Sequence, residues 1–148
     1  MRIFNPVNTR ILTGLLGVAL LGGVHAQDDL LDPEKAFRLQ VHQKDAQTVV
    51  ARFDVAKDYY LYKDRMRFSV KDAPGVTIQS IKYPAGIVKQ DPNFGKVEVF
   101  KSTVEVELLL KRSANSNKMT LLTDYQGCEE KRGVCYMPMQ KSAALTLR

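Results

Sequence analysis

Apolar and polar residues alternate along most of the chain, with the period of two that is typical of β-strands. In residues 37–42, for example, phenylalanine, leucine and valine alternate with arginine, glutamine and histidine. The same alternation recurs in residues 49–55, 66–70, 97–99, 104–110, 119–123 and 145–147. Val76, Ile78 and Ile81 predict a further strand that contains an irregularity. Strands that bury one face and expose the other are typical of antiparallel sheets.

Turn-forming residues separate these segments, at positions 43–45, 72–75 and 113–117. About eight short strands at this spacing predict an all-β protein with the architecture of an antiparallel β-sandwich. A helical turn is expected at residues 32–35 and no longer helix, because no helical pattern follows. The chain shows no internal repeat, so we expect one domain over residues 27–148.

Residues 1–26 have the features of a secretory signal peptide. Arg2 and Arg10 make its start basic, an apolar run follows, and Ala26 ends a small-residue cleavage site. The apolar run is too short and too rich in glycine for a membrane span, although an uncleaved anchor is the alternative. We therefore expect an exported protein that is cleaved near Ala26.

The charge pattern argues against nucleic-acid binding. The formal net charge is +6 at pH 7, and cleavage would remove Arg2 and Arg10 but no acidic residue. The remaining charges are dispersed along the chain, without a basic run interleaved with aromatic residues.

Cys128 and Cys135 are the two cysteines of the sequence. A disulfide between them would close a small ring, which the chain-entropy model credits with about 2.5 kcal/mol. In an exported compartment such a pair is oxidised unless something reduces it. Gly127 and Gly133 give the loop backbone freedom, and the charged residues 129–132 are expected to keep its tip in water. The spacing fits a bond that opens and closes, and it fits an inert staple equally well, because redox activity depends on environment and access.

Metal binding is a third possibility. Cys135, Met137 and Met139 offer soft ligands for copper(I), but methionines this close together also fit sheet packing. Zinc is less favoured, because His42 is the one histidine left after cleavage and it is far from the cysteines in the sequence. No nucleophile motif supports a hydrolase.

Three motifs give the chain a resemblance to a known family. Residues 125–128, which read Tyr-Gln-Gly-Cys, and residues 133–136, which read Gly-Val-Cys-Tyr, resemble the active-site loop of the amino-terminal periplasmic domain of DsbD. DsbD is the transmembrane thiol:disulfide interchange protein of Gram-negative bacteria. Residues 58–63 and residues 91–96 match two further segments of that domain in the same order. The resemblance runs from about residue 32 to the end of the chain.

The resemblance implies an immunoglobulin-like fold and a periplasmic protein-disulfide reductase that needs no cofactor. Cys135 would form the mixed disulfide with a partner, and Cys128 would resolve it. The implied electron donor is a thioredoxin-like domain served by a membrane domain. The implied acceptors are periplasmic thioredoxin-fold proteins, namely disulfide isomerases and a cytochrome c maturation thioredoxin. Whether the chain is part of a longer membrane protein or is supplied with electrons in trans stays open. A non-catalytic immunoglobulin-like binding module with a structural disulfide is the main alternative.

The resemblance also assigns supporting residues. Tyr60 and Tyr62 would lie beside the cysteines, where a phenol could bind a thiol or contribute to docking, although core packing explains such a pair equally well. Asp91 matches an acidic residue whose charge would raise the pKa values of the thiols.

A loop that caps the cysteine pair is expected at residues 91–95. In a gapless alignment Asn93 takes the place of the capping phenylalanine of the best-known family member, and Phe94 aligns with the aromatic residue that follows. Either Phe94 shields the disulfide through a shifted loop, or this cap is looser. Pro92 replaces a neighbouring acid and the cysteine loop is slightly longer, so the geometry of both loops is open.

Overall fold

The structure, a computed structural model, describes residues 30–148. The predicted signal peptide, residues 1–26, lies outside the described residues. Within residues 30–148, no helix combines the length and the apolar character needed to cross a membrane.

Twelve strands follow the short helix α1 (Pro33–Ala36), which is the helical turn expected from the sequence. They are β1 (Phe37–Gln43), β2 (Thr48–Val55), β3 (Tyr59–Tyr62), β4 (Arg67–Lys71), β5 (Val76–Lys82), β6 (Ile87–Asp91), β7 (Gly95–Phe100), β8 (Thr103–Arg112), β9 (Lys118–Tyr125), β10 (Gly127–Glu129), β11 (Val134–Cys135) and β12 (Met139–Thr146). A 3₁₀ turn, Lys63–Arg65, follows β3. The paired strands of these residues are all antiparallel.

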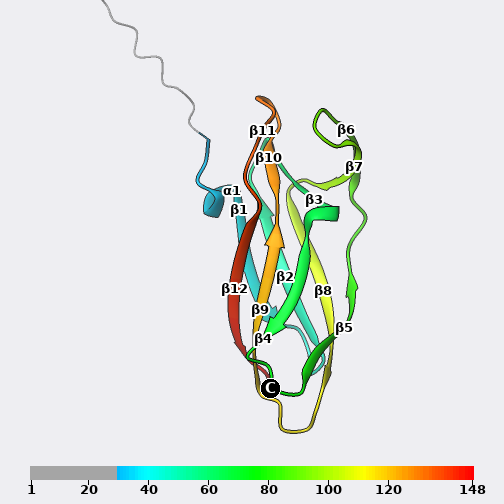
Figure 1. Ribbon diagram of the computed structural model, residues 1–148, viewed down its shortest axis with the longest axis vertical. Coiled ribbons are helices and arrows are strands. Elements are labelled where there is room, and N and C mark those ends of the chain that lie inside the picture. The colour runs from blue at the N-terminus through cyan, green and yellow to red at the C-terminus, as the bar shows by residue number, and fades with distance from the viewer. Residues whose placement is uncertain (1–29) are drawn as a thin grey trace, which may run out of the picture.

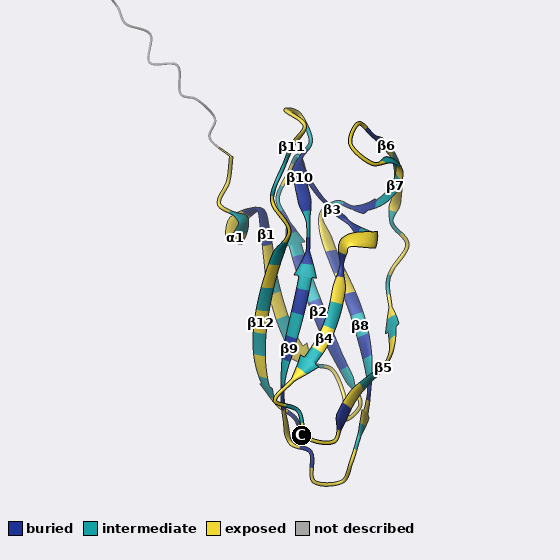
Figure 2. Ribbon diagram, in the orientation of Figure 1, coloured by how far each residue is buried: buried dark blue, intermediate teal, exposed yellow. Residues whose placement is uncertain are grey.

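Two sheets pack face to face, β1-β2-β8-β5 behind and β12-β9-β4 in front (Figure 1). Their inward side chains form one apolar core, in which Phe53 of β2 meets Tyr125 of β9 edge to face with ring centroids 5.0 Å apart. Buried and more exposed residues alternate along β8 and β9 (Figure 2). The predicted all-β antiparallel sandwich is confirmed.

The alternating segments of the sequence correspond to β1, β2, β4, β7, β8, β9 and β12. The irregularity predicted from Val76, Ile78 and Ile81 is also present, because the pairing of β5 with β8 shifts register between Ile78 and Ser80. The total exceeds the expected number of about eight because β3, β6, β10 and β11 are short and carry no regular alternation.

A third sheet, β11-β10-β3-β7-β6, covers the end of the sandwich opposite the C-terminus (Figure 1). All residues of β3 are buried, because the strand packs on both of its faces. Tyr59 and Leu61 join the main core, whereas Tyr60 and Tyr62 join a smaller cluster with Val99 and Cys128. The strand therefore separates the core that holds the sandwich together from the environment of the cysteines.

Gly127 allows β10 to approach β3 closely. A Cβ atom at this position would lie 2.4 Å from the carbonyl oxygen of Tyr60 and 2.5 Å from the ring of Phe37. The sequence-based reason for this glycine, loop freedom, applies instead to Gly133, whose φ is +64° and whose surroundings are open.

Candidate functional site

Cys128 and Cys135 form a disulfide with an S–S distance of 2.10 Å. They lie directly opposite each other on β10 and β11, and β11 is an edge strand of the third sheet. Cys128 has 0% of its surface exposed, whereas Cys135 is partly exposed. Of the two cysteines, Cys135 is therefore the one that solvent reaches.

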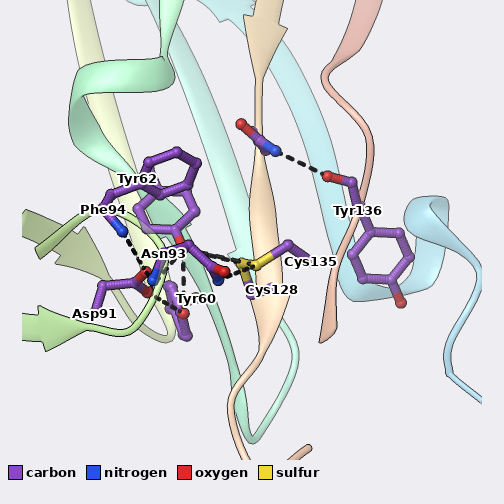
Figure 3. Close-up of a disulfide and its surroundings, with 9 residues drawn as sticks. Tyr60, Tyr62, Asp91, Asn93, Phe94, Cys128, Cys135 and Tyr136 are labelled. Atoms are coloured by element: carbon purple, nitrogen blue, oxygen red, sulfur yellow. Dashed lines mark hydrogen bonds between the residues drawn. A yellow bond between two sulfur atoms is a disulfide. The ribbon is translucent and has the colours of Figure 1, made fainter. Parts of the chain in front are cut away.

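The hydroxyls of Tyr60 and Tyr62 converge on one carboxylate oxygen. Both donate to Oδ2 of Asp91, at 2.7 and 2.8 Å (Figure 3). The Tyr62 oxygen also lies 3.1 Å from Sγ of Cys128 and 3.7 Å from Sγ of Cys135. The two tyrosines are two residues apart on β3 and share one of its faces. Tyr62 links the carboxylate to both sulfurs.

The second oxygen of Asp91 organises the loop between β6 and β7. Oδ1 accepts hydrogen bonds from the backbone N–H groups of Asn93, at 2.8 Å, and Phe94, at 3.1 Å. Such side-chain bonds to the following residues fix the start of a turn. Gly95 completes the turn with a φ of +72°, in the left-handed region that favours glycine. Asp91 therefore ties the loop between β6 and β7 to the two tyrosines.

Burial and hydrogen bonding set the charges of this cluster. Burial raises the pKa of Tyr60 strongly and that of Tyr62 to about 12, so both phenols stay neutral donors. Burial also works against ionisation of Asp91, but bonds from the two phenols and the two backbone N–H groups outweigh it and lower the pKa of this carboxyl group. A negative charge is thus held in a residue that is only 2% exposed.

The structure brings both candidate cap residues to the site, but in different ways. The side-chain amide nitrogen of Asn93 lies 3.5 Å from Sγ of Cys135 (Figure 3). The ring of Phe94 packs edge to face on Tyr62, with centroids 5.2 Å apart, and the guanidinium of Arg65 lies 4.5 Å from its centroid. Phe94 is 43% exposed. Asn93 therefore contacts the accessible sulfur, and Phe94 contacts the tyrosine beside it.

The expectation that the loop tip lies in water is wrong for Glu129. This residue is 5% exposed, and its carboxylate accepts bonds from the backbone N–H groups of Lys131 and Arg132 and from Nε of Arg132. Burial disfavours its charge, but these bonds outweigh burial and lower its pKa. The buried carboxylate of Glu129 thus stabilises the turn between β10 and β11.

Glu130, Lys89 and Lys101 form an ion-pair cluster that the sequence analysis missed. Lys89 and Lys101 both donate to the carboxylate of Glu130. Residues separated by 41 and 29 positions leave no signal of their contact in one sequence.

The backbone of Tyr136, the residue after Cys135, is held by the side chain of Gln126. Its backbone oxygen accepts a bond of 3.0 Å from the side chain of Gln126, and its ring points away from the disulfide toward α1 (Figure 3).

The groups considered for copper(I) lie in different surroundings. Met137 is 81% exposed, whereas Met139 packs against the main core. The sulfur of Cys135 is bonded to that of Cys128. His42, the zinc candidate, is exposed on β1 of the sandwich.

Comparison with known proteins places the chain in a family. Residues 27–147 match the family model described as the N-terminal part of the thiol:disulfide interchange protein DsbD. The chain belongs to the DsbD N-terminal domain family. Its membership accounts for the immunoglobulin-like sandwich and for the cysteine pair, and the resemblance noted in the sequence is confirmed.

Two relatives show how much of DsbD the chain represents. It is 36% identical over 133 residues to DsbD 1 of Pseudomonas aeruginosa, covering 90% of this chain and 22% of that protein. It is also 36% identical over 141 residues to DsbD of Ralstonia nicotianae, covering 93% of this chain and 22% of that protein. The chain thus spans about a fifth of the length of these relatives.

Two solved structures from Neisseria meningitidis share the fold. The DsbD N-terminal domain in its reduced form has a TM-score of 0.69 and 28% identity, covering 79% of this chain and 90% of that one. The DsbD N-terminal domain in complex with the PilB N-terminal domain has a TM-score of 0.64 and 28% identity, covering 79% of this chain and 88% of that one.

Proposed function

We propose that this chain is a periplasmic thiol:disulfide oxidoreductase module that relays electrons through Cys128 and Cys135. The observation that carries the proposal is the unequal exposure of the two cysteines, Cys128 at 0% and Cys135 partly exposed at the edge of the third sheet. A staple that only holds a hairpin needs no such asymmetry. A relay needs one sulfur that a partner can reach and one that is reserved for resolution.

In the reducing direction, the Cys135 thiolate attacks a disulfide of the acceptor and forms a mixed disulfide, while one acceptor sulfur leaves as a thiolate. The Cys128 thiolate then attacks Sγ of Cys135. This step releases the second acceptor sulfur and regenerates the Cys128–Cys135 bond. The acceptor has gained two electrons and the module has lost two. Recharging runs in reverse, with a donor thiolate attacking Sγ of Cys135 and Cys128 leaving.

The polar cluster would control when this chemistry occurs. The ionised carboxylate of Asp91, linked to the sulfurs by Tyr62, disfavours a second negative charge nearby and so raises the pKa of the thiols. A thiol at Cys128 would also lie within reach of the phenol oxygen of Tyr62. Asn93, with Phe94 behind it, limits the access of small molecules to Cys135. The reduced pair would therefore react slowly until a partner docks.

The family and the geometry of the site support a choice of partners. We propose a thioredoxin-like domain as electron donor, with periplasmic disulfide isomerases and cytochrome c maturation thioredoxins as acceptors. The complex of a relative with the PilB N-terminal domain supports docking of another protein on this kind of domain. The remaining part of the relatives' length leaves room for a membrane domain, whether joined to this chain or separate. Export and cleavage near Ala26 belong to the same proposal.

Trapping tests the order of the cysteines. In a Cys128→Ala variant the resolving thiol is gone, so mixed disulfides between Cys135 and a thioredoxin-fold protein should accumulate on non-reducing gels. In the matched Cys135→Ala variant they should be scarce, because the remaining thiol is buried. The opposite pattern would reverse the two roles. No mixed disulfide in either variant, together with no exchange by the wild type, would favour the structural alternative.

A further inference from the structure

A single carboxylate joins the cysteine loop to the hairpin that carries the cap. Glu130 follows β10 directly, and its two oxygens accept bonds of 2.7 and 2.8 Å from Nζ of Lys101. One of these oxygens also accepts a bond of 3.0 Å from Nζ of Lys89. Lys89 belongs to β6 and Lys101 follows β7, so Glu130 is tied to both sides of the β6–β7 hairpin.

These contacts bridge strands that are not neighbours. In the third sheet, β3 and β7 lie between β10 and β6. The exposed fractions of the three side chains are 23% for Lys89, 36% for Lys101 and 30% for Glu130, so the cluster is partly desolvated. Charge-assisted hydrogen bonds of this kind are stronger than those between neutral groups. The cluster is therefore a specific side-chain connection between the end of β10 and the β6–β7 hairpin.

The cluster continues into the site through Lys89. Its ammonium lies 5.2 Å from the ring centroid of Tyr60, and the hydroxyl of the same tyrosine donates to Asp91. Lys89 and Asp91 are two residues apart on β6, so their side chains point to the same face of the hairpin, where both contact Tyr60. The β6–β7 hairpin thus contacts Tyr60 at two positions, through Lys89 and through Asp91.

The backbone alone holds this hairpin loosely. Strand β7 pairs with β3 only through Phe100 and Val99, at the base of the hairpin. Toward the tip, β6 and β7 pair with each other as far as Asp91 and Gly95. Figure 1 shows the hairpin projecting at the same end of the molecule as β10 and β11. Near the tip, side-chain contacts of Asp91 and Asn93 therefore link the hairpin to the cysteine site. Glu130 holds the hairpin nearer its base, at Lys89 and Lys101.

We propose that Glu130 is a positioning residue that latches the β6–β7 hairpin onto the cysteine loop and so sets how often the Cys135 sulfur is open to reagents. The inference rests on the proposed function, because gating matters only for a bond that exchanges. Glu130 acts through the hairpin on Asn93, which contacts Sγ of Cys135. Without the carboxylate, the two ammonium groups would repel each other beside Tyr60, and the hairpin would leave the closed position more often.

The direct test is the rate at which dithiothreitol reduces the Cys128–Cys135 disulfide in the full chain. A Glu130→Gln variant should be reduced about three- to five-fold faster, the range expected from losing a partly desolvated ion pair that favours the closed state. Lys89→Gln and Lys101→Gln should each have a smaller effect, because the other lysine remains.

Glu107→Gln is the matched control. Glu107 also faces two lysines, Lys44 at 2.6 Å and Lys82 at 4.0 Å, and is 34% exposed, but it lies on β8 of the sandwich. This variant should be reduced at the wild-type rate. Equal acceleration in Glu107→Gln, or a wild-type rate in Glu130→Gln, overturns the latch.

A double variant separates a latch from general loosening. If Glu130 acts through the cap, Glu130→Gln should add little to the reduction rate of Asn93→Ala. Full additivity would show that Glu130 does not act through Asn93 and would overturn the mechanism. Reduction by dithiothreitol needs no protein partner, so the latch can be tested even if exchange with thioredoxin-fold proteins, and with it the proposed function, fails.

Discussion

At the scale of the residue, Asp91 organises the site. A buried carboxylate is costly unless its charge is hydrogen-bonded. Here the bonds from Tyr60, Tyr62 and the backbone of Asn93 and Phe94 supply that stabilisation. Because one oxygen binds the phenols and the other the cap, the residue that sets the charge near the sulfurs also sets the position of the loop above them.

An Asp91→Asn variant tests the electrostatic part of this role. The pKa of Asp91 is lowered, so the side chain is ionised at neutral pH. Removing that charge makes a nearby thiolate less unfavourable, so the pKa of the Cys135 thiol should fall. The pH profile of alkylation by iodoacetamide in the reduced protein should shift to lower pH. A shift to higher pH, or none, would mean that the carboxylate acts through loop geometry alone.

One variant each of Asn93 and Phe94, the two candidate cap residues, tests which of them shields the cysteine pair. Asn93→Ala removes the group that lies 3.5 Å from Sγ of Cys135, whereas Phe94→Ala removes a ring that packs on Tyr62. We expect both changes to speed oxidation of the reduced pair by glutathione disulfide, with the larger effect in Asn93→Ala. Exchange with a protein partner should change less, because the partner displaces the cap by its own contacts. A larger effect of Phe94→Ala would make Phe94 the shield, as the family pattern implies.

At the scale of the element, the site depends on how closely β10 packs on β3. Gly127→Ala would place a methyl group against the backbone of Tyr60 and the ring of Phe37. Backbone cannot yield as a flexible side chain does, so the strand must shift. We expect a loss of about 1–3 kcal/mol in urea unfolding, as for other overpacked sites, and faster reduction by dithiothreitol.

Gly133→Ala is the comparison for this prediction. Its φ of +64° strains alanine, but no atom lies within 4 Å of the added carbon. It should therefore lose less stability than Gly127→Ala. Equal losses would show that crowding at Gly127 costs no more than backbone strain at Gly133, which would contradict this prediction.

The strands of the sandwich were predictable, whereas β6, β10 and β11 of the third sheet were not. Residues 104–110 alternate because β8 faces the core on one side, and this leaves a regular signal in the sequence. Strand β6 begins with Ile87 and Val88, which are 54% and 62% exposed, because the hairpin projects from the body. Strand β6 therefore has no regularly buried face, and its residues carry no alternation. The position of Glu130 depends on partners far away in the chain, which composition and period cannot reveal.

In the candidate site, too, some residues could be predicted from the sequence and others could not. Cys128, Cys135, Tyr60, Tyr62 and Asp91 came from motifs, and the structure brings them together. The side chain that faces the sulfur was left open between Asn93 and Phe94, because loop conformation decides it. That conformation depends on bonds to Asp91 Oδ1. Glu129 was assigned to solvent because a charged tip is the usual outcome, but local N–H groups satisfy its carboxylate.

At the scale of the whole molecule, the disulfide stands apart from the core that folds the domain. The main core draws on both sheets of the sandwich, whereas Cys128 belongs to a smaller cluster with Tyr60, Tyr62 and Val99. Its partner is seven residues away in the sequence, so the bond closes a small ring and restrains no distant part of the chain. We therefore expect the domain to remain folded when the bond is opened.

A Cys128→Ala/Cys135→Ala double variant measures this independence. The chain-entropy model predicts a loss of about 2.5 kcal/mol for a ring of this size. The unfolding transition in urea should remain a single cooperative step, and the reduced wild type should show a similar loss, because the rest of the core is unchanged. A loss above about 4 kcal/mol exceeds what ring closure explains and would assign the bond a structural role. A small loss, combined with reversible reduction by a thioredoxin, fits a bond whose purpose is exchange.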